Sequence, residues 1–308
     1  MIDLASEVAA ALREGAAVVA LESTVIAHGL PWPDNLAVAH ELEAAVRTAG
    51  AVPATIAVLD GRIRVGLTPA ELERVASDRG LAKLSWRDLP VALARGGDGA
   101  TTVAGTLAVA GRVGIQVFAT GGIGGVHPGA ETTFDVSADL GALARTPCLV
   151  VCAGAKSLLD LPRTMELLET LGVPVLGYGT DELPAFYTRR SGLHVTARVD
   201  SAAEAAAVAR AQWELQLGGG LVLAVPVPVE AALDEAEVAE ALAAANERAA
   251  RAGVRGPALT PFLLADLHDH SGGRTLAANT ALLRQNAAVA GAVAVALARA
   301  GEPEDTLP

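Results

Sequence analysis

The sequence predicts an α/β protein: a three-layer α/β/α fold with a central mixed, largely parallel sheet and a helical C-terminal portion. Short apolar runs alternate with segments of helical periodicity through the first two thirds of the chain, for example at residues 17–21, 116–119, 148–152 and 221–225. Runs without regular polar alternation are typical of strands in a sheet that helices cover on both faces. The last third of the chain has helical periodicity, which indicates the helical C-terminal portion.

Local signals place the elements of the first half. Residues 2–14 have helical periodicity. Asp60-Gly61 between two apolar runs indicates a hairpin, and Thr68 with Glu71 three residues later is a capping box at the start of a helix. The elements predicted after this first helix are a strand over 17–21, a helix over 35–48, hairpin strands over 55–59 and 62–65, a helix from 68 to about 76, short segments over 81–84 and near 90–95, and a helix over 101–113.

The second half continues this alternation and then becomes helical. Its predicted elements are strands over 116–119, 148–152, 174–176 and 221–225, helices over 158–171 and 202–216, and C-terminal helices over 235–252, 261–268 and 275–300. No linker, low-complexity tract or internal repeat divides the chain, and 308 residues are within the size of one large α/β unit. We therefore expect a single catalytic domain over residues 1–308.

Composition and charge argue against several classes of protein. The formal net charge of −12 opposes binding to a nucleic-acid backbone. The N-terminus lacks the basic region of a signal peptide, and the most lipid-like stretch, residues 287–298, is too short to span a bilayer. Aromatic residues make up only 3% of the chain, so the core must consist of small aliphatic side chains. Cys148 and Cys152 lie in or beside an apolar run and are expected to be buried free thiols. These features predict a cytoplasmic protein that binds neither nucleic acid nor membrane.

One stretch, residues 116–139, combines a strand, a glycine-rich turn and two carboxylates. Its GGxGG spacing differs from the dinucleotide-binding pattern GxGxxG, but glycines still allow close approach of the backbone to a ligand and positive φ angles. Asp135, Ser137 and Asp139 lie two residues apart, so an extended segment would place them on one face, and a helix would bring Asp135 near Asp139. Paired carboxylates beside such a turn indicate a divalent cation or a general acid/base. The alternative is an ordinary turn followed by a solvated acidic loop.

Two further residues stand at the ends of apolar strands, where ligands collect in open α/β sheets. Glu22 ends the first such strand, and partial burial there would suit it to proton donation. Its alternative is a capping or salt-bridging carboxylate. Lys156 follows the strand over 148–152 among small apolar residues, where a desolvated amine could attack a carbonyl. The alternative is a phosphate-binding or exposed lysine.

Weaker candidates are found elsewhere in the chain. Lys83 is one of very few lysines in a chain that prefers arginine, which suggests a point-charge role such as phosphate contact. Thr101 and Thr102 stand at a predicted helix start, where free N–H groups can hold a phosphate; the alternative is that both are ordinary helix caps. Asn279 is a polar residue in the apolar last helix, where it could bind a backbone group or a ligand amide. His268 to His270 are interpreted as a helix end, because adjacent helical residues point in different directions.

Six blocks of the chain together resemble the pseudouridine-5'-phosphate glycosidase family. They are ALESTVIAHGLPWPDNLAVA, KLSWRDLP, GATTVAGT, ATGGIGGVHPGAETTFDVSADL, CAGAKSLLDLPRTMELLETLGVPV and LAANTALLRQNAAVA, and they span roughly residues 16–300 in the family's order. The resemblance implies an α/β/α homotrimer that reversibly cleaves the C–C glycosidic bond of pseudouridine 5'-phosphate to uracil and ribose 5-phosphate. It also implies a divalent metal, usually manganese (Mn2+).

The same resemblance implies roles for individual residues. Lys156 matches a nucleophile that forms a Schiff base with ring-opened ribose, and Glu22 matches the proton donor to the uracil carbon. Asp135 matches the ligand of one metal ion per subunit, with water completing the shell. Asp139 matches a substrate contact that also moves protons at the sugar. The other matched substrate contacts are Lys83, Thr102, Val103, Ser137, Ala138 and Asn279.

Two other classes of function remain open from the sequence. A sugar-phosphate isomerase or aldolase could use the same lysine, and a nucleotide-binding regulatory protein could use the same polar strand ends without catalysis. Release of uracil from pseudouridine 5'-phosphate separates the glycosidase from both.

Overall fold

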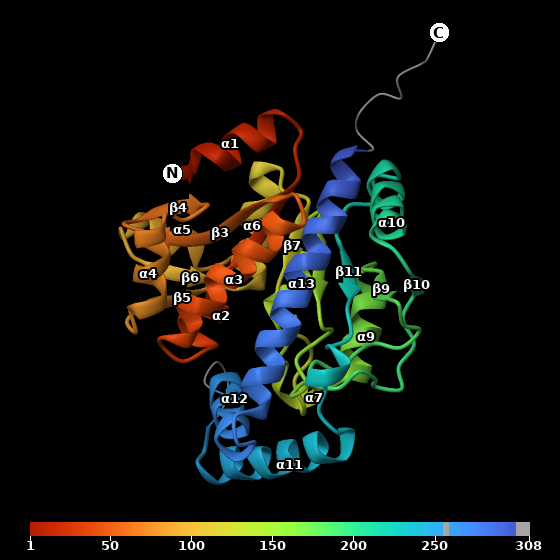
Figure 1. Ribbon diagram of the computed structural model, residues 1–308. Coiled ribbons are helices and arrows are strands. Elements are labelled where there is room, and N and C mark those ends of the chain that lie inside the picture. Colours follow the sequence, from red (N-terminus) through yellow and green to blue (C-terminus); the bar gives the residue numbers. More distant parts are fainter. Residues whose placement is uncertain (255–258, 300–308) are drawn as a thin grey trace.

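The fold is built around one large mixed sheet, seen in a computed structural model that describes residues 1–254 and 259–299 (Figure 1). The strands are β1 (Ile2–Leu4), β2 (Val18–Glu22), β3 (Val52–Leu59), β4 (Arg62–Val65), β5 (Ala82–Leu84), β6 (Gly99–Thr101), β7 (Val117–Ala119), β8 (Leu149–Cys152), β9 (Val175–Tyr178), β10 (Ala197–Val199) and β11 (Leu221–Ala224). Nine of them follow the order β1-β4-β3-β2-β7-β8-β11-β9-β10, and β6 pairs with β3 and β5. The pairs β3–β4 and β3–β6 are antiparallel, and the other pairs are parallel. The predicted mixed, largely parallel sheet is confirmed.

Helices connect and cover these strands. They are α1 (Ser6–Arg13), α2 (Thr24–His28), α3 (Asp34–Thr48), α4 (Pro69–Ser77), α5 (Leu89–Ala94), α6 (Val103–Val113), α7 (Ala130–Thr133), α8 (Ala138–Leu143), α9 (Leu161–Thr170), α10 (Ala202–Glu214), the 3-10 helix η1 (Val229–Ala231), α11 (Glu235–Arg251), α12 (Leu259–His270) and α13 (Arg274–Arg299). The capping box predicted at Thr68 and Glu71 opens α4. The helical C-terminal portion is confirmed as α11, α12 and α13.

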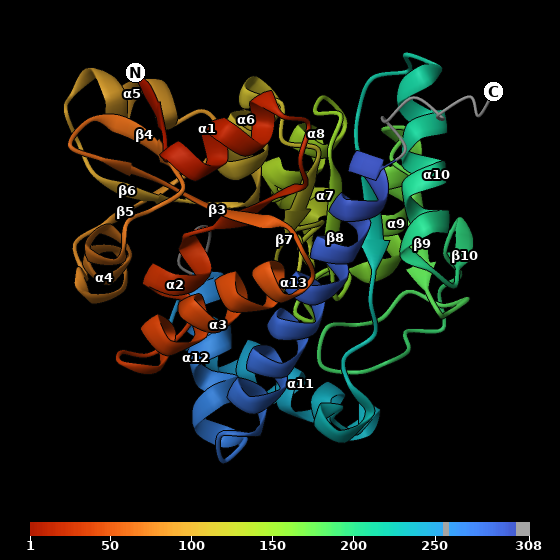
Figure 2. The same cartoon turned by 45° about the horizontal axis from the view of Figure 1, so that its top comes forward.

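Helices lie on both faces of the sheet. On one face α13 runs beside α3 and α10 and packs on β2, β7 and β8 (Figure 1). The crossover from β7 through α8 to β8 runs across the sheet in the direction opposite to the crossover from β2 through α3 to β3. Because such parallel crossovers are right-handed, α8 and the helix packed against it, α6, cover the other face (Figure 2). Strands β2, β7, β8 and β11 are therefore buried along their whole length.

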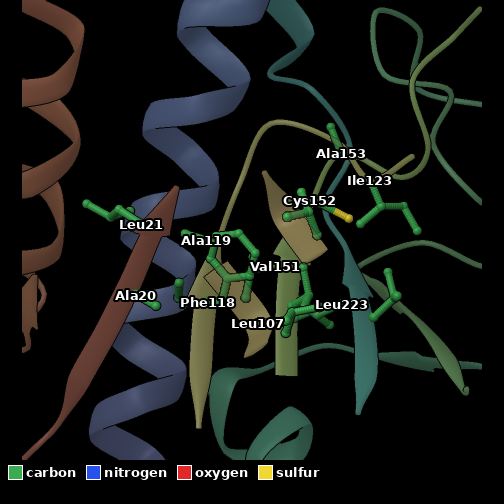
Figure 3. Packing of buried hydrophobic residues seen from close by; sticks show 14 of the residues in the cluster. Ala20, Leu21, Leu107, Phe118, Ala119, Ile123, Val151, Cys152, Ala153 and Leu223 are labelled. Atoms are coloured by element: carbon green, nitrogen blue, oxygen red, sulfur yellow. The ribbon is translucent and has the colours of Figure 1, made fainter. Parts of the chain in front are cut away.

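The sheet interior consists mainly of small aliphatic side chains, as the low aromatic content predicts. Figure 3 shows Ala20 and Leu21 of β2, Phe118 of β7 and Val151 of β8 packed side by side. Both cysteines are free and buried, as predicted; burial raises the pKa of the Cys152 thiol to about 12. Small side chains let adjacent strands and helices approach closely, so the helices pack tightly against the sheet.

Several local predictions were wrong where long-range pairing decides the structure. Residues 2–4 form β1 instead of the start of a helix, because they pair with β4, and the Asp3 carboxylate accepts hydrogen bonds from Arg62 and Arg64. Thr101 ends β6 instead of starting a helix, and α6 begins at Val103. Other elements that local patterns missed include α2, α7, α8, β6 and β10. Three of these are helices of six residues or fewer, and both strands are three residues long, too short for a periodic signal.

Helix α13 is longer than the stretch considered in the sequence. It has 26 residues, and by length and composition it is the one helix in the described ranges that could cross a membrane, which corrects the prediction made from residues 287–298. The same test is passed by core helices, and 44% of its most apolar window is buried inside the fold. Its apolar side chains pack on α3, β7 and β8. This packing accounts for its apolar composition.

Candidate active site

The candidate site lies where three neighbouring parallel strands end. Strands β2, β7 and β8 are adjacent and in register, with Leu21 beside Ala119 and Ala119 beside Val151. Parallel strands present their carboxyl ends at one edge of the sheet. The last residue of β2 is Glu22, Thr120 follows β7, and the loop after β8 leads to Lys156. Residues far apart in the sequence therefore meet at this edge, as the sequence predicts.

Glu22 is a buried carboxyl group that accepts one side-chain hydrogen bond within the described ranges. Only 7% of its surface is exposed, and Thr120 Oγ1 donates a hydrogen bond to its Oε1. Burial raises the pKa of Glu22, and the negative charge of Asp139 adds to this effect. The positive charge of Lys156 and the hydrogen bond from Thr120 act in the opposite direction, but burial is the larger effect. A carboxyl group in this setting can hold a proton and deliver it.

A cavity of about 70 Å³ adjoins Glu22 and is lined by both lysines of the chain, Lys83 and Lys156. The other lining residues are Thr24, Val25, His28, Gly29, Thr120, Gly121, Gly122, Phe186 and Asn279. Lys156 is half-buried, with its backbone N–H donating to Ile123 O at 3.1 Å. The cavity thus combines an amine, a protonatable carboxyl group and an apolar wall. These are the groups that imine chemistry requires.

Lys83 reaches the same cavity from β5. Lys83 is exposed, but desolvation by the surrounding protein, together with the positive charge of Lys156, still lowers the pKa of its amine. The negative charges of Glu22 and Asp139 oppose that shift. Two amines and two carboxyl groups therefore influence one another across the site.

The glycine-rich turn folds back on the acidic segment that follows it. Val126 forms an antiparallel bridge with Val136, and Ser137 N–H donates to Gly125 O at 2.9 Å. None of the four glycines between residues 121 and 125 has a positive φ, so their conformational freedom is not what the turn needs. They are needed for space: a Cβ on Gly124 would lie 2.2 Å from Ser137 Oγ, and one on Gly122 would lie 2.6 Å from the Phe186 ring.

Asp139 joins this turn to the start of α6. Its Oδ1 accepts a hydrogen bond from Ala104 N–H at 2.9 Å, and its Oδ2 accepts one from Gly124 N–H at 2.8 Å. The side chain is only 6% exposed. Asp135, Ser137 and Asp139 do not share one face of a strand, because Ser137 caps α8 and Asp139 lies in the first turn of that helix. Both Asp139 oxygens hold backbone groups, and the residue does not line the cavity.

Asp135 lies at the far end of the fold-back and is half-buried. Its backbone carbonyl accepts a hydrogen bond from His127 N–H at 3.0 Å. Burial lowers the pKa of His127 while the charge of Asp135 opposes the shift, and His127 Nδ1 is a buried atom without a hydrogen-bond partner in the described ranges. Within residues 1–254 and 259–299, no group of three or more His, Cys, Asp or Glu side chains surrounds one point. A carboxylate beside an unpaired imidazole nitrogen fits a divalent ion held mostly by water.

The start of α6 has few uncommitted donors. Thr102 caps the helix by accepting from Gly105 N–H at 3.2 Å, and Ala104 N–H is held by Asp139. The Val103 side chain is buried, so only its backbone N–H could contact a substrate. Thr101 is not available for such a contact, because its hydroxyl donates to Ile56 O at 2.7 Å. Ala138 is the first residue of α8 and is half-buried.

Asn279 lines the cavity from α13. Its Oδ1 is buried and has no hydrogen-bond partner in the part of the chain that the structure describes. A second cavity of about 270 Å³ adjoins the first and shares His28, Gly29 and Asn279 with it. An unpaired amide between two cavities is suited to bind a polar ligand group.

Sequence reasoning missed several residues that line or support the site. Thr120 donates to Glu22, Phe186 forms an apolar wall at a positive φ of 66°, and His28 lines both cavities. Ser23 accepts from Thr101 N–H and donates to Ile56 O, which ties the end of β2 to β3 and β6. Only Thr120 had a usable signal, since it directly follows an apolar strand.

The whole chain is similar to known proteins. The family model described as indigoidine synthase A like protein matches residues 7–296. A pseudouridine-5'-phosphate glycosidase from Herpetosiphon aurantiacus is 58% identical over 294 residues, covering 96% of this chain and 97% of the relative. One from Caldanaerobacter subterraneus subsp. tengcongensis is 54% identical over 296 residues, covering 96% of each.

Solved structures are similar over the same length. The prealnumycin C-glycosynthase AlnA, solved in complex with ribulose 5-phosphate, superposes with a TM-score of 0.91 at 45% identity, covering 97% of this chain and 98% of that one. An indigoidine synthase A-like protein from Thermotoga maritima superposes with a TM-score of 0.88 at 36% identity, covering 97% of each chain. The resemblance inferred from six sequence blocks is confirmed. The chain belongs to the indigoidine synthase A like family and, within it, groups with the pseudouridine-5'-phosphate glycosidases.

Proposed function

We propose that this protein is a pseudouridine-5'-phosphate glycosidase that reversibly converts pseudouridine 5'-phosphate and water to uracil and ribose 5-phosphate. One observation carries the proposal: the buried acid Glu22 and the amine of Lys156 line one small cavity at the ends of neighbouring strands. Curated relatives that are 52–58% identical over nearly the whole chain have this activity as their name.

The reaction explains why an amine is required. A C–C glycosidic bond has no leaving oxygen or nitrogen that one acid could protonate, as ordinary glycosidases do. Attack of the Lys156 amine on C1′ breaks the bond from C1′ to the ring oxygen and opens the ribose, and the ring oxygen takes up a proton. The nitrogen lone pair then forms a C=N bond while the bond from C1′ to uracil breaks. Water hydrolyses this imine, releasing ribose 5-phosphate and the free lysine.

Glu22 supplies the proton that the departing uracil carbon needs. The electron pair of the broken C–C bond remains on uracil and must be protonated there. Burial raises the pKa of Glu22, so the carboxyl group can carry this proton at a pH where an exposed glutamate would have lost it. The hydrogen bond from Thr120 Oγ1 orients the carboxyl group.

The remaining roles are assigned by position. Lys83, the Val103 N–H and Asn279 would bind the substrate, with Thr102, Ser137, Ala138 and Asp139 forming its support; Asp139 is also proposed to move protons at the sugar. Asp135 would hold one Mn2+ or similar ion, which when bound would supply positive charge near the phosphate or ribose. The complex of the similar AlnA with ribulose 5-phosphate supports a sugar-phosphate site in this fold.

Three properties of the family are proposed for this chain as a whole. It would act as a single catalytic domain, assemble as a homotrimer and work in the cytoplasm. It would bind a small-molecule substrate but neither nucleic acid nor membrane, in keeping with its net charge of −12.

The decisive assay is uracil release from pseudouridine 5'-phosphate, measured with and without manganese. We expect release by the wild type, stimulation by manganese, and a much weaker stimulation in Asp135→Ala. No uracil under either condition would overturn the proposed function. In a separate incubation with ribose 5-phosphate alone, its consumption by a protein that releases no uracil from pseudouridine 5'-phosphate would favour a sugar-phosphate isomerase or aldolase that uses the same lysine.

Borohydride trapping tests the role of Lys156 directly. Reduction in the presence of ribose 5-phosphate should add one sugar to Lys156, located by peptide mass mapping. Because the chain has only two lysines, Lys83 is an internal control and should remain unmodified. Lys156→Ala and Lys156→Arg should both lose turnover and trapping, although arginine keeps the positive charge beside Glu22. Near-normal turnover in Lys156→Arg would exclude an imine at this position.

A further inference from the structure

The inference concerns Asn286, a buried amide in the middle of α13. It is 1% exposed and lies seven residues after Asn279, which places both on the same side of the helix, two turns apart. Helix α13 packs on β7 and β8. Asn286 does not line the cavity, so it cannot act on a substrate directly.

Asn286 holds the backbone at the point where β7 ends. Its Nδ2 donates to Thr120 O at 2.8 Å and more weakly to Gly121 O at 3.4 Å. On the other side, Thr120 N–H donates to Val151 O at 3.0 Å. The peptide groups on both sides of the Thr120 Cα are therefore fixed, one by β8 and one by α13. With its backbone fixed, the Thr120 side chain directs its hydroxyl at Glu22 Oε1.

We propose that Asn286 is a positioning residue for the proton donor: through Thr120 it sets the orientation of the Glu22 carboxyl group. The inference rests on the proposed function and deepens it. It links the C-terminal helix to the sheet edge by a chain of two hydrogen bonds, Asn286 to the Thr120 carbonyl and the Thr120 hydroxyl to Glu22.

The hydrogen bonding of the Asn286 amide indicates that this residue positions Thr120 and does not merely fill space in the core. Asn286 Oδ1 is buried and has no hydrogen-bond partner in the described ranges. Burying such an atom costs free energy that a leucine of similar shape would avoid. The donor half of the amide is the part that is used. Gly121 O already accepts a hydrogen bond from Ala153 N–H at 2.8 Å, so the Thr120 carbonyl is the acceptor that depends on Asn286.

The pKa of Glu22 reports on the two hydrogen bonds that link Asn286, Thr120 and Glu22. The hydrogen bond from Thr120 stabilises the charged Glu22 carboxylate and so lowers its pKa, together with the charges of Lys156 and Lys83. Asp139 and burial act in the opposite direction. Loss of the Thr120 bond should therefore raise the pKa of Glu22 further. A residue that merely filled space in α13 would leave that pKa unchanged.

The test compares Asn286→Leu, Thr120→Val and the double variant. Each single change removes one donor and keeps the number of side-chain heavy atoms. We expect kcat for uracil release to fall roughly ten- to a hundredfold in Asn286→Leu, with KM within about threefold, because orientation of the donor is lost and binding is not. The double variant should be no slower than the slower single variant, since both changes interrupt one chain. The alkaline limb of the kcat–pH profile should move to higher pH in all three.

A measurement without turnover separates this inference from the proposed function. The infrared band of the protonated Glu22 carboxyl group, assigned by its loss in Glu22→Gln, can be titrated in any folded variant. Its midpoint should move to higher pH in Asn286→Leu and Thr120→Val. If the wild type releases no uracil, the function fails, but this titration still tests the positioning role. An unchanged midpoint in Asn286→Leu would overturn the inference whatever the activity.

Two further variants guard against trivial outcomes. Asn246 on α11 is exposed and donates Nδ2 to Leu242 O at 2.9 Å, so Asn246→Leu makes the same chemical change away from the site and should leave kcat and the Glu22 band unchanged. If Asn286→Leu does not fold, Asn286→Ala removes the donor without adding volume or charge, and the same two shifts are expected. Additive losses in the double variant, or wild-type kcat in either Asn286 variant, would contradict positioning.

Discussion

Two buried carboxyl groups, Glu22 at the end of β2 and Asp139 in the first turn of α8, differ in what surrounds them. Their exposed fractions are almost equal, 7% and 6%. Glu22 receives one hydroxyl hydrogen bond and lines the cavity. Asp139 receives two backbone N–H groups, from α6 and from the glycine-rich turn, and does not line the cavity.

The difference indicates that the number and kind of hydrogen-bond donors, rather than the degree of burial, distinguishes these two carboxyl groups. The two backbone N–H groups that donate to Asp139 come from different segments, so its side chain holds those segments together. One hydroxyl donor compensates burial only in part, so burial still raises the pKa of Glu22. The substrate-contact role carried over to Asp139 remains a prediction. The structure adds a supporting role that its sequence position did not reveal.

The largest expected effect is on turnover in Glu22→Gln. Glutamine keeps the shape and can accept from Thr120, but it cannot donate a carboxyl proton. We expect kcat for uracil release to fall by about 10²- to 10⁴-fold, the usual contribution of a general acid, with little loss of folded protein. Steady-state kinetics and thermal unfolding measure both quantities.

Glu43 on α3 provides the matched control. Its Oε1 accepts from Thr55 Oγ1 at 2.6 Å, and burial raises its pKa, so its setting is like that of Glu22 but away from the cavity. Glu43→Gln should leave kcat unchanged. An equal fall in both variants would mean that the loss in Glu22→Gln reflects general destabilisation rather than proton transfer.

The next effect is on stability in Asp139→Asn. An amide offers one acceptor oxygen and turns an NH₂ group toward the other backbone donor, so one buried N–H is left unpaired and the charge assistance is lost. We expect the free energy of unfolding to fall by about 3 kcal/mol, measured by urea titration. Asp160, which caps α9 by accepting from Arg163 N–H, is a control whose Asn variant should cost far less, because asparagine caps equally well. A smaller loss in Asp139→Asn than in Asp160→Asn would refute the clamping role.

A somewhat smaller effect is expected when the same clamp is disturbed from the glycine side. A Cβ on Gly124 would lie 2.2 Å from Ser137 Oγ and 2.8 Å from Asp139 Oδ2, so Gly124→Ala should cost about 2 kcal/mol through overpacking. The control is Gly141 in α8, where an added Cβ would be 3.7 Å from Trp86, and Gly141→Ala should be neutral or slightly stabilising. Urea unfolding of both variants measures these changes in the free energy of unfolding. Equal changes in Gly124→Ala and Gly141→Ala would show that the glycine-rich turn can shift to accommodate the added Cβ.

The smallest effect concerns the pH dependence of stability. Burial raises the pKa of Glu22 in the folded protein above its ordinary value of 4.5. At a pH between 4.5 and the folded pKa, the folded protein therefore holds a proton that the unfolded chain has released. Stability from this group is complete below pH 4.5 and is lost as the pH rises through the folded pKa. Glu22→Gln does not titrate and should therefore gain stability relative to the wild type as pH rises. Urea unfolding at a series of pH values from 4 to 8 measures the free energy of unfolding of both proteins. If the difference between the two free energies stays constant over this range, a raised pKa of Glu22 is contradicted.

Much of the fold could be predicted because its signals are local. Continuous apolar runs marked β2, β7, β8 and β11, and a capping box marked α4. Segments such as β1 and β6 could not be predicted, since three-residue strands exist only through the partners that they pair with across the sheet. Periodicity in residues 2–14 pointed to a helix, and pairing with β4 overrode it for the first three of them.

In the candidate site, too, some residues could be predicted from local sequence patterns and others depend on contacts between distant segments. Glu22 and Lys156 could be named from the sequence because each follows an apolar strand, and parallel strands end at a common edge. Thr120 and Asn286 could not be assigned roles, because their partners lie 98 and 166 residues away along the chain. The contact between the glycine-rich turn and α8 was also beyond local reasoning.

By itself the sequence determined the fold class, the family resemblance and the chemical types at the strand ends, because these depend on patterns within a few residues. Only the tertiary structure decided which of three acids, Glu22, Asp135 and Asp139, is buried beside an amine and short of hydrogen bonds. That outcome depends on packing between β2, β7, α6 and α13, since desolvation and hydrogen-bond supply arise from neighbours that are distant in sequence.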